Sequence, residues 1–248
     1  MGSPAAVRSS SGEPIGVWSA ALKVVTEGGD LFAVLRRTGQ LTSLNKGQPL
    51  FEAGESADAV FLVVSGTVRS SVMLSDGRRQ IVRFHEADEL IGITAAKHYL
   101  YSAEAVTPIE ARTVSRLWLD GLLHLRPRLC LSLIPSRDLE PAQRHMALLG
   151  RMTARERLCA FLLQRLRSGA GSIELPMSRT DIADYLGLSI ETVSRTMTQL
   201  RAEGLIRTPS ANTIEVVDPG RLEGVIQDRA ARPARGQTPA PRKQLIDG

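Results

Sequence analysis

The sequence predicts an α+β chain with an N-terminal roll of short strands, a helical middle and a C-terminal unit of helices closed by a hairpin. β-rich runs between residues 41 and 84 are separated by glycines. Spaced apolar side chains follow between 139 and 149, and two short amphipathic patterns flank a turn at 187–189. The chain has 248 residues, of which 43% are hydrophobic, so it is long enough for two ordinary domains.

Residues 29–117 are predicted to form the β roll. Apolar and β-branched residues fill runs at 59–64, 67–73 and 80–84. Glycines lie between or beside these runs, at Gly47, Gly54, Gly66 and Gly77. Short strands separated by glycine turns favour a β-sandwich or roll. We expect the small, polar segment 1–28 to be flexible, and apolar residues between Trp18 and Leu41 indicate one or two short helices.

Residues 118–150 are predicted to be mainly helical and to carry a dimer interface. The spacing of three, four and three residues is typical of a seam for a partner helix, and it joins Leu139, Ala142, Met146 and Leu149. We therefore expect a homodimer, with packing of the seam on the chain's own β domain as the alternative. Pro135 and Pro141 oppose one long helix, so we place Pro135 at or before its start and Pro141 in its first turn.

Residues 151–218 are predicted to form a domain that contains a helix-turn-helix. An amphipathic helix at 151–167 opens it. Ser178 can then cap a second helix, with Asp181 three residues later completing a capping box. Gly187 stands where a helix end needs a positive φ, and Ser189 can cap the next helix at once. The resulting three-residue turn is the length that this motif requires.

The second helix of the motif has an inward stripe and an outward polar face. Val193, Met197 and Leu200 recur at spacings of four and three and should pack inward. We expect Glu191, Ser194 and Arg195 to read base edges, because arginine can donate twice to guanine and a carboxylate can accept from cytosine. The candidates for contacts with the DNA backbone on this motif are Ser178, Thr180, Ser189, Thr192 and Thr198. The alternative is that Glu191 only complements the helix dipole and Arg195 is a solvated surface charge.

A hairpin and a tail complete the predicted architecture. β-rich residues at 205–208 and 213–217 flank a turn at 209–212, which predicts the hairpin of a winged helix. Arg207 and Ser210 could reach the DNA backbone from it; a hairpin that only closes the small core is equally compatible. Residues 219–248 are predicted to be a disordered basic tail, with one possible short helix at 221–227.

Composition limits the function classes. The net charge of +5 and the pI near 9.7 suit a polyanionic partner such as double-stranded DNA. No apolar run approaches the ~20 residues of a membrane span, and the N-terminus lacks the apolar core of a secretory signal. Two cysteines without a close partner are simplest to explain in the reducing cytoplasm. We find no P-loop, dinucleotide fingerprint, metal-ligand cluster or catalytic triad pattern, so no catalytic or metal site is predicted and the chain is expected not to be an enzyme.

Over about residues 40–217 the chain resembles the CRP/FNR superfamily of bacterial transcription regulators. The most specific match is DIADYLGLSIETVSRTMTQLRAEGLI, supported by LLGRMTARERLCAFLL and GESADAVFLVVSGTVRSSVMLSDGRRQIVRFH. Within it, the segment from Glu191 to Arg195 resembles the FNR and FixK types. The resemblance implies a cyclic-nucleotide-binding-like roll and a homodimer on a TTGAT-N4-ATCAA-like palindrome. Arg195 and Glu191 would then lie on the central G·C pair, with Ser194 near the flanking thymine.

The family's sensor types can be compared with residues of this chain. Tyr101 and Ser102 match the Arg-Ser pair that holds a cyclic nucleotide phosphate, so the arginine is missing, and Asp88 stands where a glycine is usual. Cyclic AMP binding is therefore not expected. The iron–sulfur type needs four cysteines, whereas this chain has Cys130 and Cys159 alone. We interpret both thiols as buried packing residues, with redox sensing by Cys130 as the minority alternative.

The FixK-like type, which has no bound effector and no cofactor, is what remains. The resemblance then implies an activator of microaerobic respiratory genes that contacts RNA polymerase. The alternative is a regulator that senses a ligand or haem through the roll. Four histidines could in principle ligate haem, although a lone histidine is more often a surface or core residue. They are His85, His98, His124 and His145.

Overall fold

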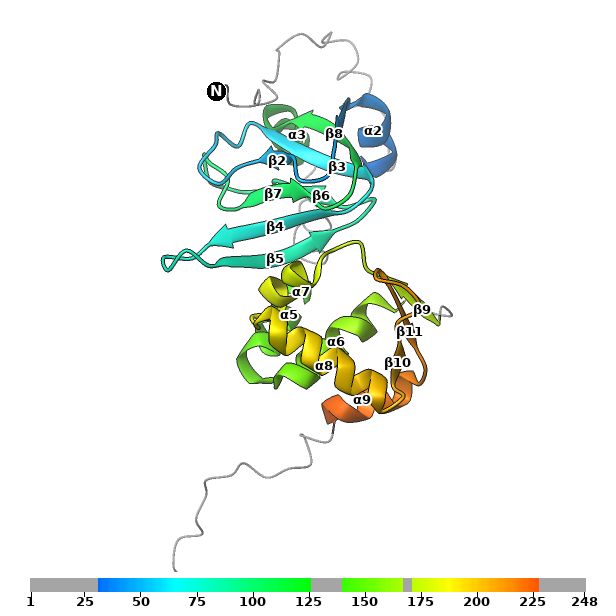
Figure 1. Ribbon diagram of the computed structural model, residues 1–248. Helices are drawn as coiled ribbons and strands as arrows, with labels where there is room; N and C mark the ends of the chain where they lie inside the picture. The colour runs from blue at the N-terminus through cyan, green and yellow to red at the C-terminus, as the bar shows by residue number, and fades with distance from the viewer. Residues whose placement is uncertain (1–30, 126–139, 167–170, 228–248) are drawn as a thin grey trace, which may run out of the picture.

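The computed structural model describes residues 31–125, 140–166 and 171–227, which form two stacked domains (Figure 1). The β roll lies above a mainly helical domain, and helix α7 of the lower domain lies directly beneath strand β5 of the roll. The predicted flexible segment 1–28, Leu139, Cys130 and most of the predicted basic tail fall outside the described residues.

Two four-stranded antiparallel sheets make up the roll, which confirms the predicted β domain. One sheet has the order β1-β8-β3-β6 and the other β2-β7-β4-β5. The strands are β1 (Gln40–Leu44), β2 (Pro49–Phe51), β3 (Ala59–Ser65), β4 (Val68–Met73), β5 (Arg79–His85), β6 (Leu90–Ile91), β7 (Ser102–Ala105) and β8 (Ile109–Ser115). Strands β4 and β5 form a hairpin, and β5 contacts α7 of the lower domain.

Helices α2 (Leu31–Thr38) and α3 (Arg116–Leu125) flank the roll. Leu35 of α2 and Leu122 of α3 are fully buried against Leu62 of β3 and Val114 of β8. The residues predicted to be helical at 118–150 are thus represented by α3 and, after the undescribed residues 126–139, by α5 (Glu140–Arg151). Pro141 lies in the first turn of α5, the place predicted for it.

The lower domain is a helical bundle with a three-stranded sheet at one side. Its remaining elements are α6 (Ala154–Arg165), β9 (Ser172–Glu174), α7 (Arg179–Leu186), α8 (Ile190–Ala202), β10 (Ile206–Arg207), β11 (Thr213–Val216) and α9 (Pro219–Gln227). The predicted helix at 151–167 is shorter than expected. Thr153 caps α6 with Glu156 in a capping box, and this cap separates α6 from α5.

Two elements of this domain correct the predicted boundaries. Strand β9 was not predicted, because its three residues form a strand only by pairing with β11 of the hairpin. Helix α9 begins at Pro219, inside the stretch 219–248 that was predicted to be a disordered tail. Leu222 is fully buried where α9 packs on α6, so the folded domain extends beyond residue 218 to Gln227. The short helix predicted at 221–227 is thereby confirmed and is slightly longer.

One of the apolar clusters spans the two domains. Ile81 and Phe84 of β5 belong to the same buried cluster as Leu158 and Phe161 of α6 and Leu186 of α7. In the part of the chain that the structure describes, no helix is long and apolar enough to cross a bilayer.

Candidate nucleic-acid interface

Helix α7 begins and ends as the sequence predicts. Ser178 Oγ accepts a hydrogen bond from Asp181 N at 3.1 Å, and Asp181 Oδ2 accepts one from Ser178 N at 3.1 Å, which completes the capping box. Gly187 ends the helix in the left-handed region at φ 61° and ψ 42°. A side chain at this position would meet Leu149 Cδ2 at 3.3 Å. The turn between the two helices is therefore fixed by local chemistry and by contact with α5.

Helix α8 packs its apolar stripe inward. Ser189 Oγ accepts a hydrogen bond from Thr192 N at 3.2 Å and caps the helix. Val193, Met197 and Leu200 are buried, as predicted, so the opposite side of the helix faces outward. This arrangement is that of the second helix of a helix-turn-helix, whose outer face can enter a major groove.

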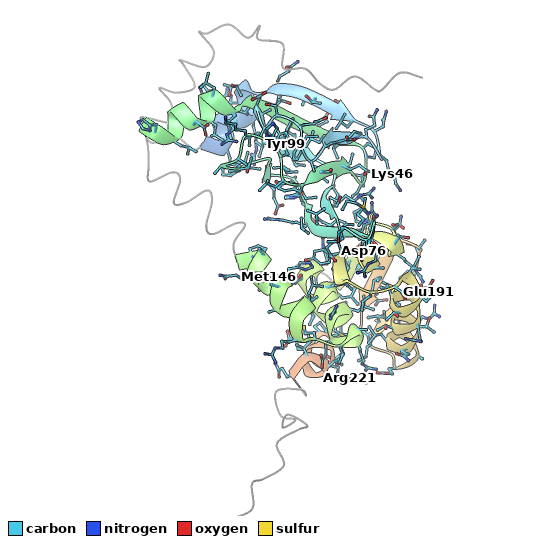
Figure 2. The ribbon with its side chains drawn as sticks, turned by 90° about the vertical axis from the view of Figure 1, so that its left-hand side faces the viewer. Lys46, Asp76, Tyr99, Met146, Glu191 and Arg221 are labelled. Carbon is cyan, nitrogen blue, oxygen red and sulfur yellow. The ribbon has the colours of Figure 1, made fainter. Side chains whose placement is uncertain are left out.

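The residues predicted to read bases lie on that outer face. Glu191 and Arg195 are exposed and Ser194 is half-buried, and Figure 2 shows Glu191 at the outer edge of the helix. Hydrogen bonds from its own backbone N–H and from the Ser189 hydroxyl lower the pKa of Glu191 below its ordinary value of 4.5. Glu191 is therefore an acceptor at neutral pH, whereas Arg195 can only donate. This pair of groups matches the two edges of a G·C base pair.

The candidates for backbone contacts surround this face. Ser178, Thr180, Ser189, Thr198 and Arg207 are exposed and Thr192 is half-buried. Some of these groups also bond locally: Thr198 Oγ1 donates to Ser194 O at 3.0 Å, and Arg207 Nη1 lies 3.5 Å from Glu215 Oε1 on the neighbouring strand. Their side chains still point to solvent, so local bonding orients them without burying them.

Arg179 is a cation beside this face that the sequence analysis missed. It is the first residue of α7, and its Nη1 lies 3.5 Å from Ser194 Oγ on α8. The crossing of the two helices brings these residues together, whereas the spacing of residues within either helix does not show that Arg179 reaches Ser194.

The predicted seam on α5 is only partly free. Ala142 is exposed and Met146 is 63% exposed, whereas Leu149 packs against the core of the lower domain. His145 and Leu148 turn inward and are buried. Ala142 and Met146 thus do not pack on the chain's own β roll. Figure 2 shows Met146 and Glu191 on opposite sides of the lower domain, so an apolar contact there leaves the outer face of α8 open.

The interior of the roll is occupied by aromatic side chains. The rings of Phe51 and Tyr99 stack with centroids 3.8 Å apart, and Tyr101 lies 5.6 Å from Phe51. Tyr99 Oη donates to Ala59 O at 2.7 Å, and Tyr101 Oη accepts from Gly92 N at 3.2 Å. Both hydroxyl groups therefore bond to the backbone of the chain itself.

Ser102 and Asp88, at positions that correspond to the family's phosphate-binding motif, also bond to other groups of the chain. Ser102 Oγ accepts from Ala53 N at 3.0 Å. Asp88 adopts φ 71°, the conformation that favours the usual glycine, and pairs with Arg36 of α2. A cavity of about 350 Å³ lies instead at the junction of the two domains, between β5, α5, α6 and α7.

Cysteine and histidine side chains in the described residues do not gather into a site. Cys159 is fully buried, as predicted, and burial raises the pKa of its thiol to about 11. His85 Nε2 lies 2.7 Å from Ser70 Oγ inside the roll, and His145 stacks on Tyr185 of α7 with ring centroids 4.1 Å apart. Within residues 31–125, 140–166 and 171–227, no three His, Cys, Asp or Glu residues are arranged to hold a metal ion.

Comparisons with known proteins agree with this geometry. Residues 41–124 match the family model of the cyclic nucleotide-binding domain, and residues 156–225 match that of the Crp-like helix-turn-helix domain. The nitrogen fixation regulation protein FixK of Rhizobium meliloti is 39% identical over 181 residues, which are 72% of this chain and 83% of that protein. The transcriptional activatory protein AadR of Rhodopseudomonas palustris is 37% identical over 186 residues, covering 72% and 77%.

A solved structure shows the same fold. That of FixK2 from Bradyrhizobium japonicum is similar to this chain with a TM-score of 0.72 and 38% identity, over 75% of this chain and 96% of that one. The two family models cover the roll and the helix-turn-helix, and the relatives are named as a regulation protein and a transcriptional activatory protein. This chain therefore belongs to the CRP/FNR family, in its FixK-like branch, and is a DNA-binding transcription regulator rather than an enzyme.

Proposed function

We propose that this regulator is a cytoplasmic homodimer that binds a TTGAT-N4-ATCAA-like palindrome without a bound effector and activates transcription by contacting RNA polymerase. The observation that carries the DNA-reading part is the exposed face of α8. Arg195 and Glu191 are one helical turn apart, so they can address neighbouring bases of each half-site. In the proposed dimer, the exposed Ala142 and Met146 contact their counterparts.

The effector-free mode is supported by the roll. Aromatic rings fill its interior, and the arginine that would hold a nucleotide phosphate is replaced by Tyr101. A roll packed in this way has no need of a ligand to become ordered. The names of the FixK relatives refer to nitrogen fixation, and we place this chain among regulators of microaerobic respiratory genes by that kinship.

The experiment is a binding titration with protein purified from air-grown cells, at moderate salt and with no added ligand. We expect the palindrome to bind far more tightly than the same DNA with its central G·C pairs swapped. Arg195→Ala should lose that discrimination, by on the order of 100-fold, because each half-site loses a bidentate contact. Arg201→Ala removes the same charge from the last turn of α8 and serves as the matched control.

Two results would contradict the proposal. Intact discrimination in Arg195→Ala shows that other side chains read the bases. Failure of the unliganded wild type to bind the palindrome shows that an effector is needed. An absorbance spectrum and a thermal-shift screen with cyclic nucleotides then test the alternative of a haem-responsive or ligand-responsive roll.

A further inference from the structure

The hairpin of β4 and β5 holds the first helix of the helix-turn-helix through a group of ion pairs. Arg69 Nη1 donates to Asp181 Oδ1 at 2.9 Å, and Arg79 Nη2 donates to the same oxygen at 2.8 Å. Arg79 Nε also donates to Asp184 Oδ2 at 2.8 Å. Both arginines belong to the roll and both aspartates to α7, so charge of opposite sign faces across the domain boundary.

Asp181 and Arg69 are shielded from water, whereas the side chains of Arg79 and Asp184 are 26% and 24% exposed. The side chain of Asp181 is 5% exposed and that of Arg69 is 14% exposed. Gln80 Nε2 adds hydrogen bonds to Asp184 O at 2.6 Å and Tyr185 O at 3.2 Å. Removing one partner of a shielded pair leaves the other charge buried without compensation. Such a charge gains more water when the two domains separate, so loss of a partner favours separation.

Asp181 has a second role that links these ion pairs between the domains to DNA reading. We call the group of Arg69, Arg79, Asp181 and Asp184 the clamp. Its Oδ2 caps α7 through Ser178, while its Oδ1 accepts from both arginines. One carboxylate therefore joins the start of the helix-turn-helix to the roll. In this docked arrangement Glu191 and Arg195 stay exposed on the outer face of α8, and Met146 stays exposed on α5. The contact thus leaves the reading face accessible.

We propose that Arg79, with Asp181 and Asp184, positions the helix-turn-helix of each protomer, which we call its reading head. The clamp fixes the angle of α8 relative to the roll and so sets the half-site spacing that the dimer accepts. This inference rests on the proposed function, since spacing has meaning only for a dimer on a palindrome. Two rigidly held heads accept one spacing, because the distance between successive grooves is fixed. Heads that can swivel accept several spacings and bind each of them less tightly.

The test compares full-length Arg79→Gln, Asp184→Asn and the double variant with wild type. Affinity is measured for the palindrome with a four-base spacer, for versions with five and six bases, and for a single half-site. The matched control is Arg78→Gln, since Arg78 precedes Arg79 on the hairpin, has a side chain 78% exposed and pairs only with Asp76 in the described structure. Asp181 is left intact because changing it removes the cap of α7.

We expect Arg79→Gln to bind the four-base palindrome about tenfold less tightly, since only dimers with both helix-turn-helix units docked can contact both half-sites at once. Half-site affinity should stay at the wild-type value, so the preference for the four-base spacer shrinks. The loss is limited because Arg69 still holds Asp181 and Arg165 still pairs with Glu86 at 2.6 Å across the same boundary. The double variant should be no worse than Arg79→Gln alone, because the contact of Arg79 with Asp184 is already lost in that variant.

Three results would overturn the inference: tighter operator binding by Arg79→Gln, which marks an inhibitory contact; an unchanged spacer preference despite a lower melting temperature; or an equal loss on the half-site. If Arg79→Gln does not fold, Asp184→Asn decides by the same criteria. Hydrogen exchange of the α7 amides gives a readout without DNA, with faster exchange expected in Arg79→Gln and not in Arg78→Gln. A wild type that binds no palindrome refutes the proposed function, whereas the inference fails only by comparison of variants.

Discussion

The two domains direct their polar groups in opposite ways. In the roll, Tyr99 and Tyr101 point inward and bond to the backbone of the chain itself. In the lower domain, Glu191 and Arg195 point outward from a helix whose apolar stripe is buried. The aromatic side chains of the roll thus bond within the chain, while α8 presents exposed polar groups to its surroundings. The ion pairs of Arg69 and Arg79 with α7 connect the roll to the helix-turn-helix.

The largest expected effect is on the roll itself. Phe51 is 3% exposed and contacts Phe61, Tyr99 and Tyr101, so Phe51→Ala should lower the free energy of unfolding by about 3–5 kcal/mol. Urea denaturation measures the loss, and Leu100→Ala, at a side chain that is 69% exposed, should change little. If Phe51→Ala keeps its stability, the roll interior is not tightly packed and its contrast with α8 disappears.

The helix-turn-helix could be predicted from sequence because its determinants are local. Ser178 caps with Asp181, Gly187 supplies the positive φ and Ser189 caps α8, and all of these contacts form within a few residues. The burial of Val193, Met197 and Leu200 follows from helical periodicity in the same short segment. The sequence alone therefore predicts which face of α8 is polar and exposed.

Other elements depend on partners that are distant in sequence. Strand β9 exists because Ile173 pairs with Ile214, and α9 is ordered because Leu222 is buried against α6. The clamp joins Arg79 to Asp184 across 105 residues, and a surface arginine has many possible partners in a sequence. Asp181 was predicted as a cap, but its bonds to the roll were not, because an N-cap signature describes only the first turn of a helix.

A medium effect is expected at the turn that orients α8. Gly187→Ala places a side chain at φ 61°, which costs about 1–2 kcal/mol, and adds a contact of 3.3 Å with Leu149 Cδ2. Gly204→Ala is the control, because Gly204 has φ +69° but open space around it, so it reports backbone strain alone. We expect thermal unfolding to show a larger loss for Gly187→Ala than for Gly204→Ala. Equal losses would mean that contact with α5 does not shape the turn.

The smallest effect on stability is expected at His145, and it depends on pH. His145 of α5 is 8% exposed, stacks on Tyr185 and has no hydrogen-bond partner for either ring nitrogen among the described residues. Burial, and then the charge of Arg157 on α6, lower the pKa of His145 below its ordinary value of 6.5. The unfolded chain therefore binds more protons than the folded one between the two pKa values, so stability falls as the pH drops below about 6.5.

His145→Phe keeps an aromatic ring on Tyr185 and removes this titration. Relative to the variant, the wild type should lose stability below pH 6.5 with a slope under about 1.4 kcal/mol per pH unit, the limit for one proton. Urea denaturation between pH 7.5 and pH 5 measures the difference, and subtracting the two curves cancels the other titrating groups. Exposed His98→Gln is the control and should follow the wild type. If the His145→Phe and wild-type curves stay parallel, water reaches His145 in the folded protein, and the contact between α5 and α7 is looser than the stacking on Tyr185 indicates.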